Sequence, residues 1–81
     1  MASLEDRLVA SGCNLPLNQF QDSLIDVLNE MFRAWSVDEL LLHPREEMEY
    51  CSVVRRKLEC HDLPDELILR CALHRRKHPG D

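Results

Sequence analysis

LNQFQDSLIDVLNEMFRAW, residues 17–35, is the most strongly patterned segment of the chain. Its apolar side chains recur at steps of three and four residues, which places them on one wide face of an α-helix. We therefore expect a helix over residues 17–35 at the centre of the core. The residues of its apolar face are Phe20, Leu24, Val27, Leu28, Met31, Phe32 and Trp35.

The polar face of this expected helix carries three acids at successive four-residue steps, Asp22, Asp26 and Glu30. Like charges at this spacing destabilise a helix by about 0.2–0.5 kcal/mol per pair. We therefore expect basic side chains from another segment to pair with this acidic ridge. Just upstream, an Asn–Leu–Pro sequence predicts that Asn14 caps the helix and that Pro16 lies in its first turn.

Further helix boundaries follow from capping residues and prolines. The sequence Ser36-Val37-Asp38-Glu39 is a capping box and predicts the start of a short helix. Pro44 ends that helix and opens the next one, because proline suits the first helical position. This second helix is expected over about residues 44–58. We expect its buried stripe to contain Met48, Cys51, Val54 and Leu58.

Two more helices complete the expected set. One spans about residues 4–11, with Ser3 as its cap and Gly12 just past its end. The other spans about residues 64–77, after a second Asx–Leu–Pro sequence that contains Asp62. No segment alternates with the period of two that is typical of strands. The sequence therefore predicts an all-α fold, a compact bundle of four or five short helices.

The composition is that of one folded domain. The chain has 81 residues, of which 44% are hydrophobic and 31% charged. A chain of this length forms a single domain and buries roughly 60% of its unfolded surface. We therefore expect one helical domain over residues 1–81.

The sequence shows neither a membrane span nor a targeting signal. It contains no apolar run near the roughly 20 residues that cross a bilayer, and its first ten residues lack the pattern of a signal peptide. We expect a cytoplasmic protein without membrane association. The four cysteines lack the dense spacing of a secreted disulfide scaffold, so we interpret them as reduced thiols: Cys13, Cys51, Cys60 and Cys71.

Charge is distributed unevenly along the chain, whose net charge is −5. Residues 1–50 have ten acids and three bases, whereas residues 51–81 have five acids and seven bases. Two basic tips, Arg55-Arg56-Lys57 and Arg75-Arg76-Lys77, each close an expected helix. Cations at helix C-termini are favoured by the helix dipole, and they also suit an anionic partner. We keep both interpretations and name Arg55, Arg56 and Lys57 as candidate anion-binding residues.

Several motifs of enzymes are missing from this sequence. The two glycines, Gly12 and Gly80, both lie at expected helix ends, so no glycine-rich loop is available to hold a phosphate. None of the serines lies in a recognisable catalytic motif. We therefore expect a non-enzymatic protein with no catalytic residues, no cofactor and no small-molecule substrate.

A structural zinc site is one alternative. Cys71, His74 and His78 lie at i, i+3 and i+7 on one helical stripe, and the two histidines have the spacing of half a zinc finger. The sequence has no Cys-x2-Cys pair to supply the other half. Since a closed zinc site requires four ligands, we assign no metal ligand here.

Nucleic-acid binding is a second alternative. The basic tips, together with two helices joined by a short turn near residues 59–63, have some likeness to a helix-turn-helix unit. In such units the start of the second helix meets the DNA, but here it reads Pro64-Asp65-Glu66, which repels phosphates. We therefore regard a nucleic-acid partner as disfavoured.

The last expected helix has apolar residues on two sides. Leu67, Ile68 and Cys71 form one stripe, and Leu69 and Leu73 form another on the opposite side.

A terminal helix in so small a domain rarely buries both sides in its own chain, so we predict that the chain binds a protein partner or a second copy of itself. The residues predicted to bind it are Leu69, Leu73, Arg75, Arg76 and Lys77. In the alternative, Leu69 and Leu73 pack inside the chain, against the first helix at Leu4, Leu8 and Val9.

Overall fold

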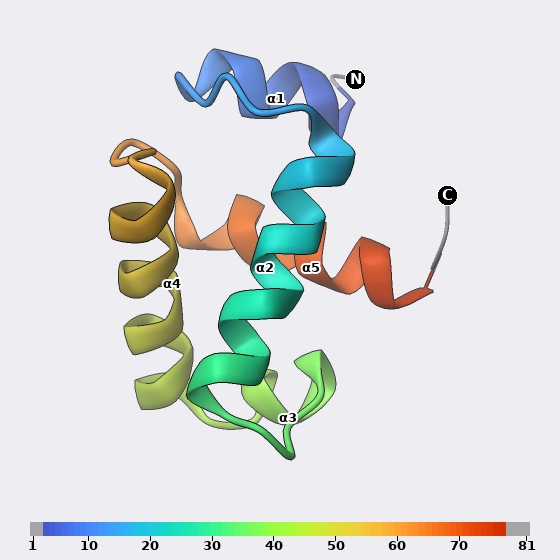
Figure 1. Cartoon of the computed structure of the whole chain (residues 1–81), viewed down its shortest axis with the longest axis vertical. Coiled ribbons are helices and arrows are strands. Elements are labelled where there is room, and N and C mark those ends of the chain that lie inside the picture. The colour runs from blue at the N-terminus through green and yellow to red at the C-terminus, as the bar shows by residue number, and fades with distance from the viewer. Residues whose placement is uncertain (1–2, 78–81) are drawn as a thin grey trace.

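The computed structural model of this chain describes residues 3–77. Within this range the structure is all-helical and contains no strand, as the sequence predicted (Figure 1). The five helices are α1 (Leu4–Ala10), α2 (Leu17–Met31), α3 (Val37–Leu41), α4 (Pro44–Leu58) and α5 (Asp65–Lys77).

The helix α2 lies at the centre of the bundle and packs against α1, α4 and α5. In Figure 1, α2 descends through the middle of the molecule, α4 returns beside it, and α5 crosses behind it. The helix α1 covers the upper end of α2, and α3 lies at the lower end. Since α3 also packs against α4 and α5, these three helices meet on one side of the molecule.

The helix boundaries that depend on local capping agree with the sequence prediction. The Ser3 hydroxyl accepts a hydrogen bond from the Asp6 N–H (3.1 Å), and the Ser36 hydroxyl accepts one from the Glu39 N–H (3.2 Å). Pro44 is the first residue of α4. Gly12 lies just past the end of α1 and has φ +85°. Glycine is favoured in this left-handed conformation because it has no Cβ.

Two details at the ends of α2 differ from the prediction. Its N-cap is Pro16, with no side-chain hydrogen bond, so Asn14 does not cap the helix. Its last residue is Met31, because the backbone of Phe32 (φ −138°, ψ 79°) is not helical. Beyond that point the rings form a stack in which Trp35 lies between Phe32 (centroids 4.7 Å apart) and His43 (4.5 Å). This aromatic stack occupies the turn where the sequence pattern predicted four more helical residues.

The core contains a residue that the predicted stripe of α4 omitted. Tyr50 is fully buried, and its hydroxyl donates a hydrogen bond to the Leu24 carbonyl (2.7 Å). Met48, predicted to be buried, is 65% exposed, so this part of the prediction is wrong. The face of α4 that carries Tyr50 is therefore the one that packs into the core. A tyrosine ring can be buried in this way because its hydroxyl has a hydrogen-bond partner. The remaining fully buried residues of α4 are Cys51 and Val54.

The acidic ridge of α2 receives the cations that its sequence required. Asp22 pairs with Arg75 of α5, and Glu30 pairs with Lys57 of α4. The side chain of Asp26, between them, has no hydrogen-bond or ion-pair partner among residues 3–77. The two pairs connect both neighbouring helices to the polar face of α2.

Candidate functional site

The side chains of Leu69 and Leu73 line a groove on the side where α3, α4 and α5 meet. We call it the leucine groove; its volume is about 620 Å³. Both leucines are half-buried, because their inner atoms pack against the edge of the core. The residues that line the groove are Leu41 of α3, Glu47 of α4, and Asp65, Glu66, Leu69, Arg70 and Leu73 of α5.

The two apolar sides of α5 therefore have different surroundings. Its inner side is buried in the core through Leu67, Ile68, Cys71 and Ala72. Its outer side, with Leu69 and Leu73, lines the leucine groove together with residues of α3 and α4. Val9 of α1, expected to cover these leucines in the alternative packing, is 65% exposed.

Most of the large exposed apolar side chains belong to the segment that contains Leu41, a lining residue of the groove. Within the described residues, four large hydrophobic side chains are exposed, and three of them belong to residues 41–48. Leu41 lines the leucine groove and is 37% exposed. Leu42 (73%) follows it in the chain, and Met48 (65%) follows the lining residue Glu47. The α3–α4 corner thus exposes apolar surface, of which Leu41 lines the groove.

The charges around the leucine groove are only partly paired within the chain. Glu66 accepts a hydrogen bond from Arg7 of α1 (2.7 Å) and forms a second ion pair with Arg70 (3.0 Å). The hydrogen bond from Arg7 lowers the pKa of Glu66. Asp65 pairs with Arg55. Glu47 is the acid of the groove that lacks an ion-pair partner among residues 3–77.

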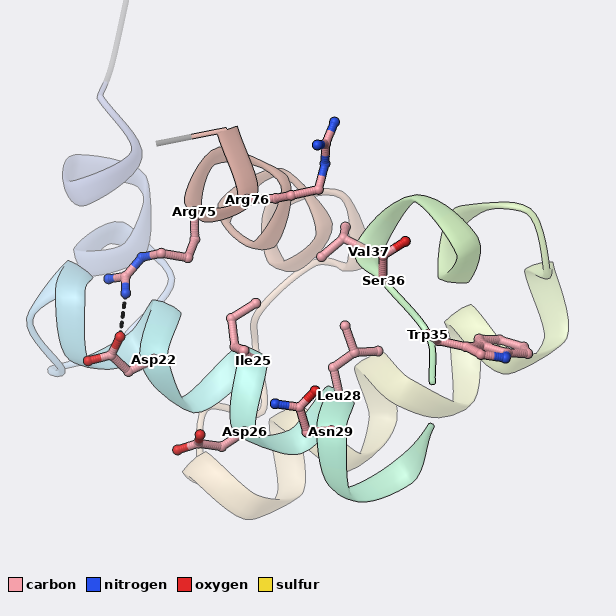
Figure 2. A pocket seen from close by; sticks show the side chains of 10 residues that line it. All are labelled: Asp22, Ile25, Asp26, Leu28, Asn29, Trp35, Ser36, Val37, Arg75 and Arg76. Carbon is pink, nitrogen blue, oxygen red and sulfur yellow. Dashed lines mark hydrogen bonds and ion pairs between the residues drawn. The ribbon is translucent and has the colours of Figure 1, made fainter. Parts of the chain in front are cut away.

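A second groove, of about 650 Å³, lies between α2, α3 and α5 (Figure 2). Its apolar part is formed by Ile25, Leu28 and Val37. At one end of it Arg75 reaches from α5 to Asp22 of α2, as Figure 2 shows. Ser36, which also lines this groove, is already engaged as the cap of α3. The remaining lining residues are Asp26, Asn29, Trp35 and Arg76.

The basic tip of α5 lies mostly in intramolecular ion pairs. Arg75, whose side chain is only 17% exposed, pairs with Asp22 and also donates to the Asn18 carbonyl. Arg76 pairs with Asp38 of α3 (3.0 Å). Lys77 is exposed. This tip therefore connects α5 to α2 and α3.

The basic tip of α4 has a similar arrangement. Arg55 pairs with Asp65 and donates to the Leu63 carbonyl (3.0 Å), which fixes the turn between α4 and α5. Lys57 pairs with Glu30. Arg56 is exposed and, within residues 3–77, has no ion-pair partner.

Of the three residues in the zinc alternative, the structure describes Cys71 and His74. These two residues have different surroundings. Cys71 is fully buried and His74 is exposed, while His78 lies outside the described residues. Buried Gln21 joins the two positions: its amide donates to the Cys71 carbonyl (3.0 Å) and lies 3.3 Å from the His74 ring nitrogen. Over residues 3–77 no three His, Cys, Asp or Glu side chains form a group suited to a metal ion.

Sequence reasoning found the leucines of the groove but missed two of its polar lining residues. Neither Glu47 nor Arg70 was assigned to a binding site from the sequence. Arg70 follows Leu69 and lies four residues after Glu66, which is the spacing of a helical ion pair. Glu47 belongs to another helix, so only the tertiary packing brings it to the groove.

No protein-family model, curated protein or solved structure matches this chain. Within the described residues, no helix is both long and apolar enough to cross a membrane. The function is therefore inferred from the surface of this chain alone.

Proposed function

We propose that this chain is a small non-enzymatic protein-interaction module whose leucine groove receives an amphipathic helix of a partner protein. The observation that carries the proposal is the exposed apolar surface of one region. Leu41, Leu69 and Leu73 line the groove, and two further exposed large hydrophobic side chains, Leu42 and Met48, directly follow lining residues in the chain. Monomeric soluble proteins rarely expose contiguous apolar surface of this kind without a partner.

The shape and charge of the groove favour a helix with a basic residue. A concave apolar strip between helices suits the apolar face of another helix, which inserts side chains at i and i+3 or i+4. Glu47, on the α4 side, has no partner in the described chain and is available for a Lys or Arg of the incoming helix. An opposite charge at the rim steers association and fixes the orientation of the helix.

The charge pairing also ranks a protein partner above nucleic acid. In the described chain, four of the six cations in the basic tips already pair with carboxylates: Arg55, Lys57, Arg75 and Arg76. A phosphate backbone would have to compete with these carboxylates for each of the four. The leucine groove needs no such rearrangement before it binds.

Site-specific photo-crosslinking in the native host tests the proposal. A benzophenone amino acid at Leu42, next in the chain to the lining residue Leu41, should capture one partner, whereas the same group at the similarly exposed Val9 should not. The crosslinked segment should be an amphipathic helix with a Lys or Arg. The purified segment should bind the wild-type chain in calorimetry and bind a Glu47→Lys variant at least about tenfold more weakly, since like charges then meet.

The control for the groove is the double variant Leu69→Glu with Leu73→Glu, which should lose the crosslink while retaining its helical circular dichroism. If that variant unfolds, Leu41→Glu replaces it, because Leu41 is already partly exposed. Equal capture from Leu42 and Val9, or unchanged binding by Leu41→Glu, would refute the proposal. Crosslinks from Leu42 to another copy of this chain would assign the groove to self-association instead.

A further inference from the structure

The groove between α2, α3 and α5 differs from the leucine groove in the apolar surface that it offers. Its apolar floor consists of Ile25, Leu28 and Val37. Leu28 and Val37 are only 3% and 2% exposed, and Ile25 is half-buried. None of the large hydrophobic side chains that are exposed within residues 3–77 lines this groove. The floor is therefore a small apolar area at the edge of the core, without the exposed apolar surroundings of the leucine groove.

The two ends of this groove limit the length of what it can hold. At one end Arg75 of α5 reaches across to Asp22 of α2, and Trp35 lies at the opposite end (Figure 2). Arg75 also donates to the Asn18 carbonyl of α2 (3.1 Å), so two contacts hold it in place. A partner helix could not pass this end without displacing Arg75. The volume of about 650 Å³ lies in the range of about 300–1,000 Å³ that is typical of small-molecule pockets.

Among the charged residues that line the groove, one carboxylate is unpaired. Asp22 and Arg75 neutralise each other. Arg76 pairs with Asp38 of α3, and Figure 2 shows its side chain pointing away from the apolar floor. The side chain of Asp26 has no hydrogen-bond or ion-pair partner among residues 3–77. The groove therefore presents one uncompensated negative charge, which favours a ligand with one positive charge.

Two polar side chains of α2 lie next to the apolar floor. Asp26 follows Ile25 in the chain and Asn29 follows Leu28, so each adjoins a residue of the floor. Asp26 and Asn29 are three residues apart on one helix, which places them on the same face. Both are exposed, and their side-chain oxygens can accept hydrogen bonds from an ammonium group.

We propose that this groove binds a small arylalkylamine, a molecule with one aromatic ring and one protonated amine joined by a short carbon chain. The ring covers the floor of Ile25, Leu28 and Val37, and the ammonium group donates hydrogen bonds to Asp26 and Asn29. An aromatic ring offers a large apolar area with few rotatable bonds to immobilise. The amine is bound without reaction. This site is separate from the leucine groove, so neither proposal depends on the other.

The charge of the ligand sets a measurable preference. An ion pair at an exposed rim contributes modestly to affinity, so the amine should bind about two- to fivefold more tightly than a neutral molecule with the same ring. An anion should bind most weakly, because it meets the carboxylate of Asp26 while Arg75 and Arg76 are already paired. Added salt should narrow these differences, since it screens exposed charges.

The test titrates the full folded chain with phenethylamine, phenethyl alcohol and hydrocinnamate, which share a phenyl ring on a short chain and differ in charge. Carbon-13 NMR of the methyl groups reports where each probe binds. Ile25, Leu28 and Val37 report on this groove, and Leu69 and Leu73 report on the leucine groove. All three probes should shift the signals of the first set, with affinity falling from the amine to the alcohol to the carboxylate.

Substitutions of Asp26 change the charge without altering the core, because its side chain is exposed. Asp26→Asn should bind the amine and the alcohol equally, with the affinity for the alcohol unchanged. Asp26→Lys should reverse the order, so that hydrocinnamate binds more tightly than phenethylamine. Glu49→Gln is the matched control, since it removes an exposed carboxylate of α4 that does not line the groove. This variant should keep the wild-type order.

Several outcomes would overturn the proposal. Preference of the wild-type chain for hydrocinnamate would show that Arg75 and Arg76 determine the charge selectivity of the groove. Equal affinities for amine and alcohol, shifts confined to Leu69 and Leu73, or no binding by any probe would also refute it. A blocked helical peptide with a Phe and a Lys one turn apart tests the other occupant. If this peptide shifts the floor signals and binds more tightly than phenethylamine, the groove belongs to a protein segment.

Discussion

The hydroxyl of Tyr50 on α4 donates a 2.7 Å hydrogen bond to the main-chain carbonyl of Leu24 on α2, in the interior of the bundle. Tyr50 is fully buried and is the largest fully buried side chain among the described residues. Burial raises the pKa of the Tyr50 hydroxyl, because the phenolate form would lose its hydration. This contact therefore links the interiors of the two longest helices.

Replacing Tyr50 with Phe should destabilise the fold by about 1 kcal/mol, because the ring is retained while the hydrogen bond is lost. For a domain of this size that corresponds to a fall in Tm of about 4–8 °C. Urea unfolding at pH 7 measures the difference. Tyr50→Leu, which also removes ring packing, serves as the more damaging comparison. A Tyr50→Phe variant as stable as wild type would show that the hydrogen bond contributes nothing net.

Tyr50 also shows where sequence reasoning failed. The periodic pattern of α4 counted Met48 as core and passed over Tyr50, but the structure exposes Met48 and buries Tyr50. A phenol is apolar in its ring and polar at its tip, so its burial depends on whether a partner for the hydroxyl exists. That partner, the Leu24 carbonyl, belongs to another helix. Sequence periodicity within α4 carries no information about it.

Most features set by a few neighbouring residues were predicted correctly, although Asn14 does not cap α2. The starts of α1, α3 and α4 follow from Ser3, Ser36 and Pro44, because capping depends on residues within one turn. Features set by packing were not. The early end of α2 depends on residues that are far apart in the chain. So do the carboxylates with which the basic tips pair. For the same reason the sequence located Leu69 and Leu73 but not Glu47, which only packing brings to the groove.

Two left-handed residues past helix ends, Glu59 and Gly12, predict substitutions of opposite sign. Glu59 adopts φ +56° after α4, where a side chain is strained, so Glu59→Gly should stabilise the fold by about 0.5–1 kcal/mol. Gly12 adopts φ +85° after α1, so Gly12→Ala should destabilise it by about 1 kcal/mol. A Cβ at Gly12 would meet no atom within 4 Å, which leaves backbone strain as the cause.

Chemical denaturation at pH 7 measures both effects, and Glu59→Ala is the matched control, since it removes the carboxylate but keeps the strained conformation. Glu59→Ala should gain less than Glu59→Gly. Equal gains from the two variants would mean that the charge of Glu59, near the end of the α4 dipole, causes the loss rather than its backbone.

The ion pair between Arg7 and Glu66 predicts which of two substitutions, at Arg7 or at Arg70, raises the pKa of Glu66 more. The hydrogen bond from Arg7 is the main cause of the lowered pKa of Glu66, and Arg70 contributes least. Arg7→Gln should therefore raise the pKa of Glu66 more than Arg70→Gln does. Carbon-13 NMR titration of the Glu66 carboxyl in each variant measures both values.

The sign of the linked stability follows from this lowered pKa. The contribution of the pair is present above the ordinary carboxyl pKa of about 4.3 and is lost as the pH falls through the folded value. Arg7→Gln should therefore flatten the acid side of the stability profile. A larger pKa change in Arg70→Gln would assign the interaction to the helical i, i+4 pair instead.

The buried thiols predict that the fold weakens in alkali. Burial raises the pKa of Cys51 to about 12 and that of Cys71 to about 11. The folded protein thus retains protons that the unfolded chain releases above about pH 8.5. Stability is therefore complete below about pH 8.5 and falls as the pH rises toward the folded values, by about 1.4 kcal/mol per pH unit for each such thiol.

Cys51→Ala isolates one of these thiols, because its side chain cannot ionise. Urea unfolding between pH 8 and pH 10.5, with a reductant present to exclude disulfides, should show a loss of stability less steep than in wild type by about 1.4 kcal/mol per pH unit. The variant itself starts lower at pH 8, since removing a buried sulfur leaves a small cavity. Ser52→Ala, at the exposed neighbouring position, should keep the wild-type slope. An unchanged slope in Cys51→Ala would show that this thiol ionises alike in the folded and unfolded chain.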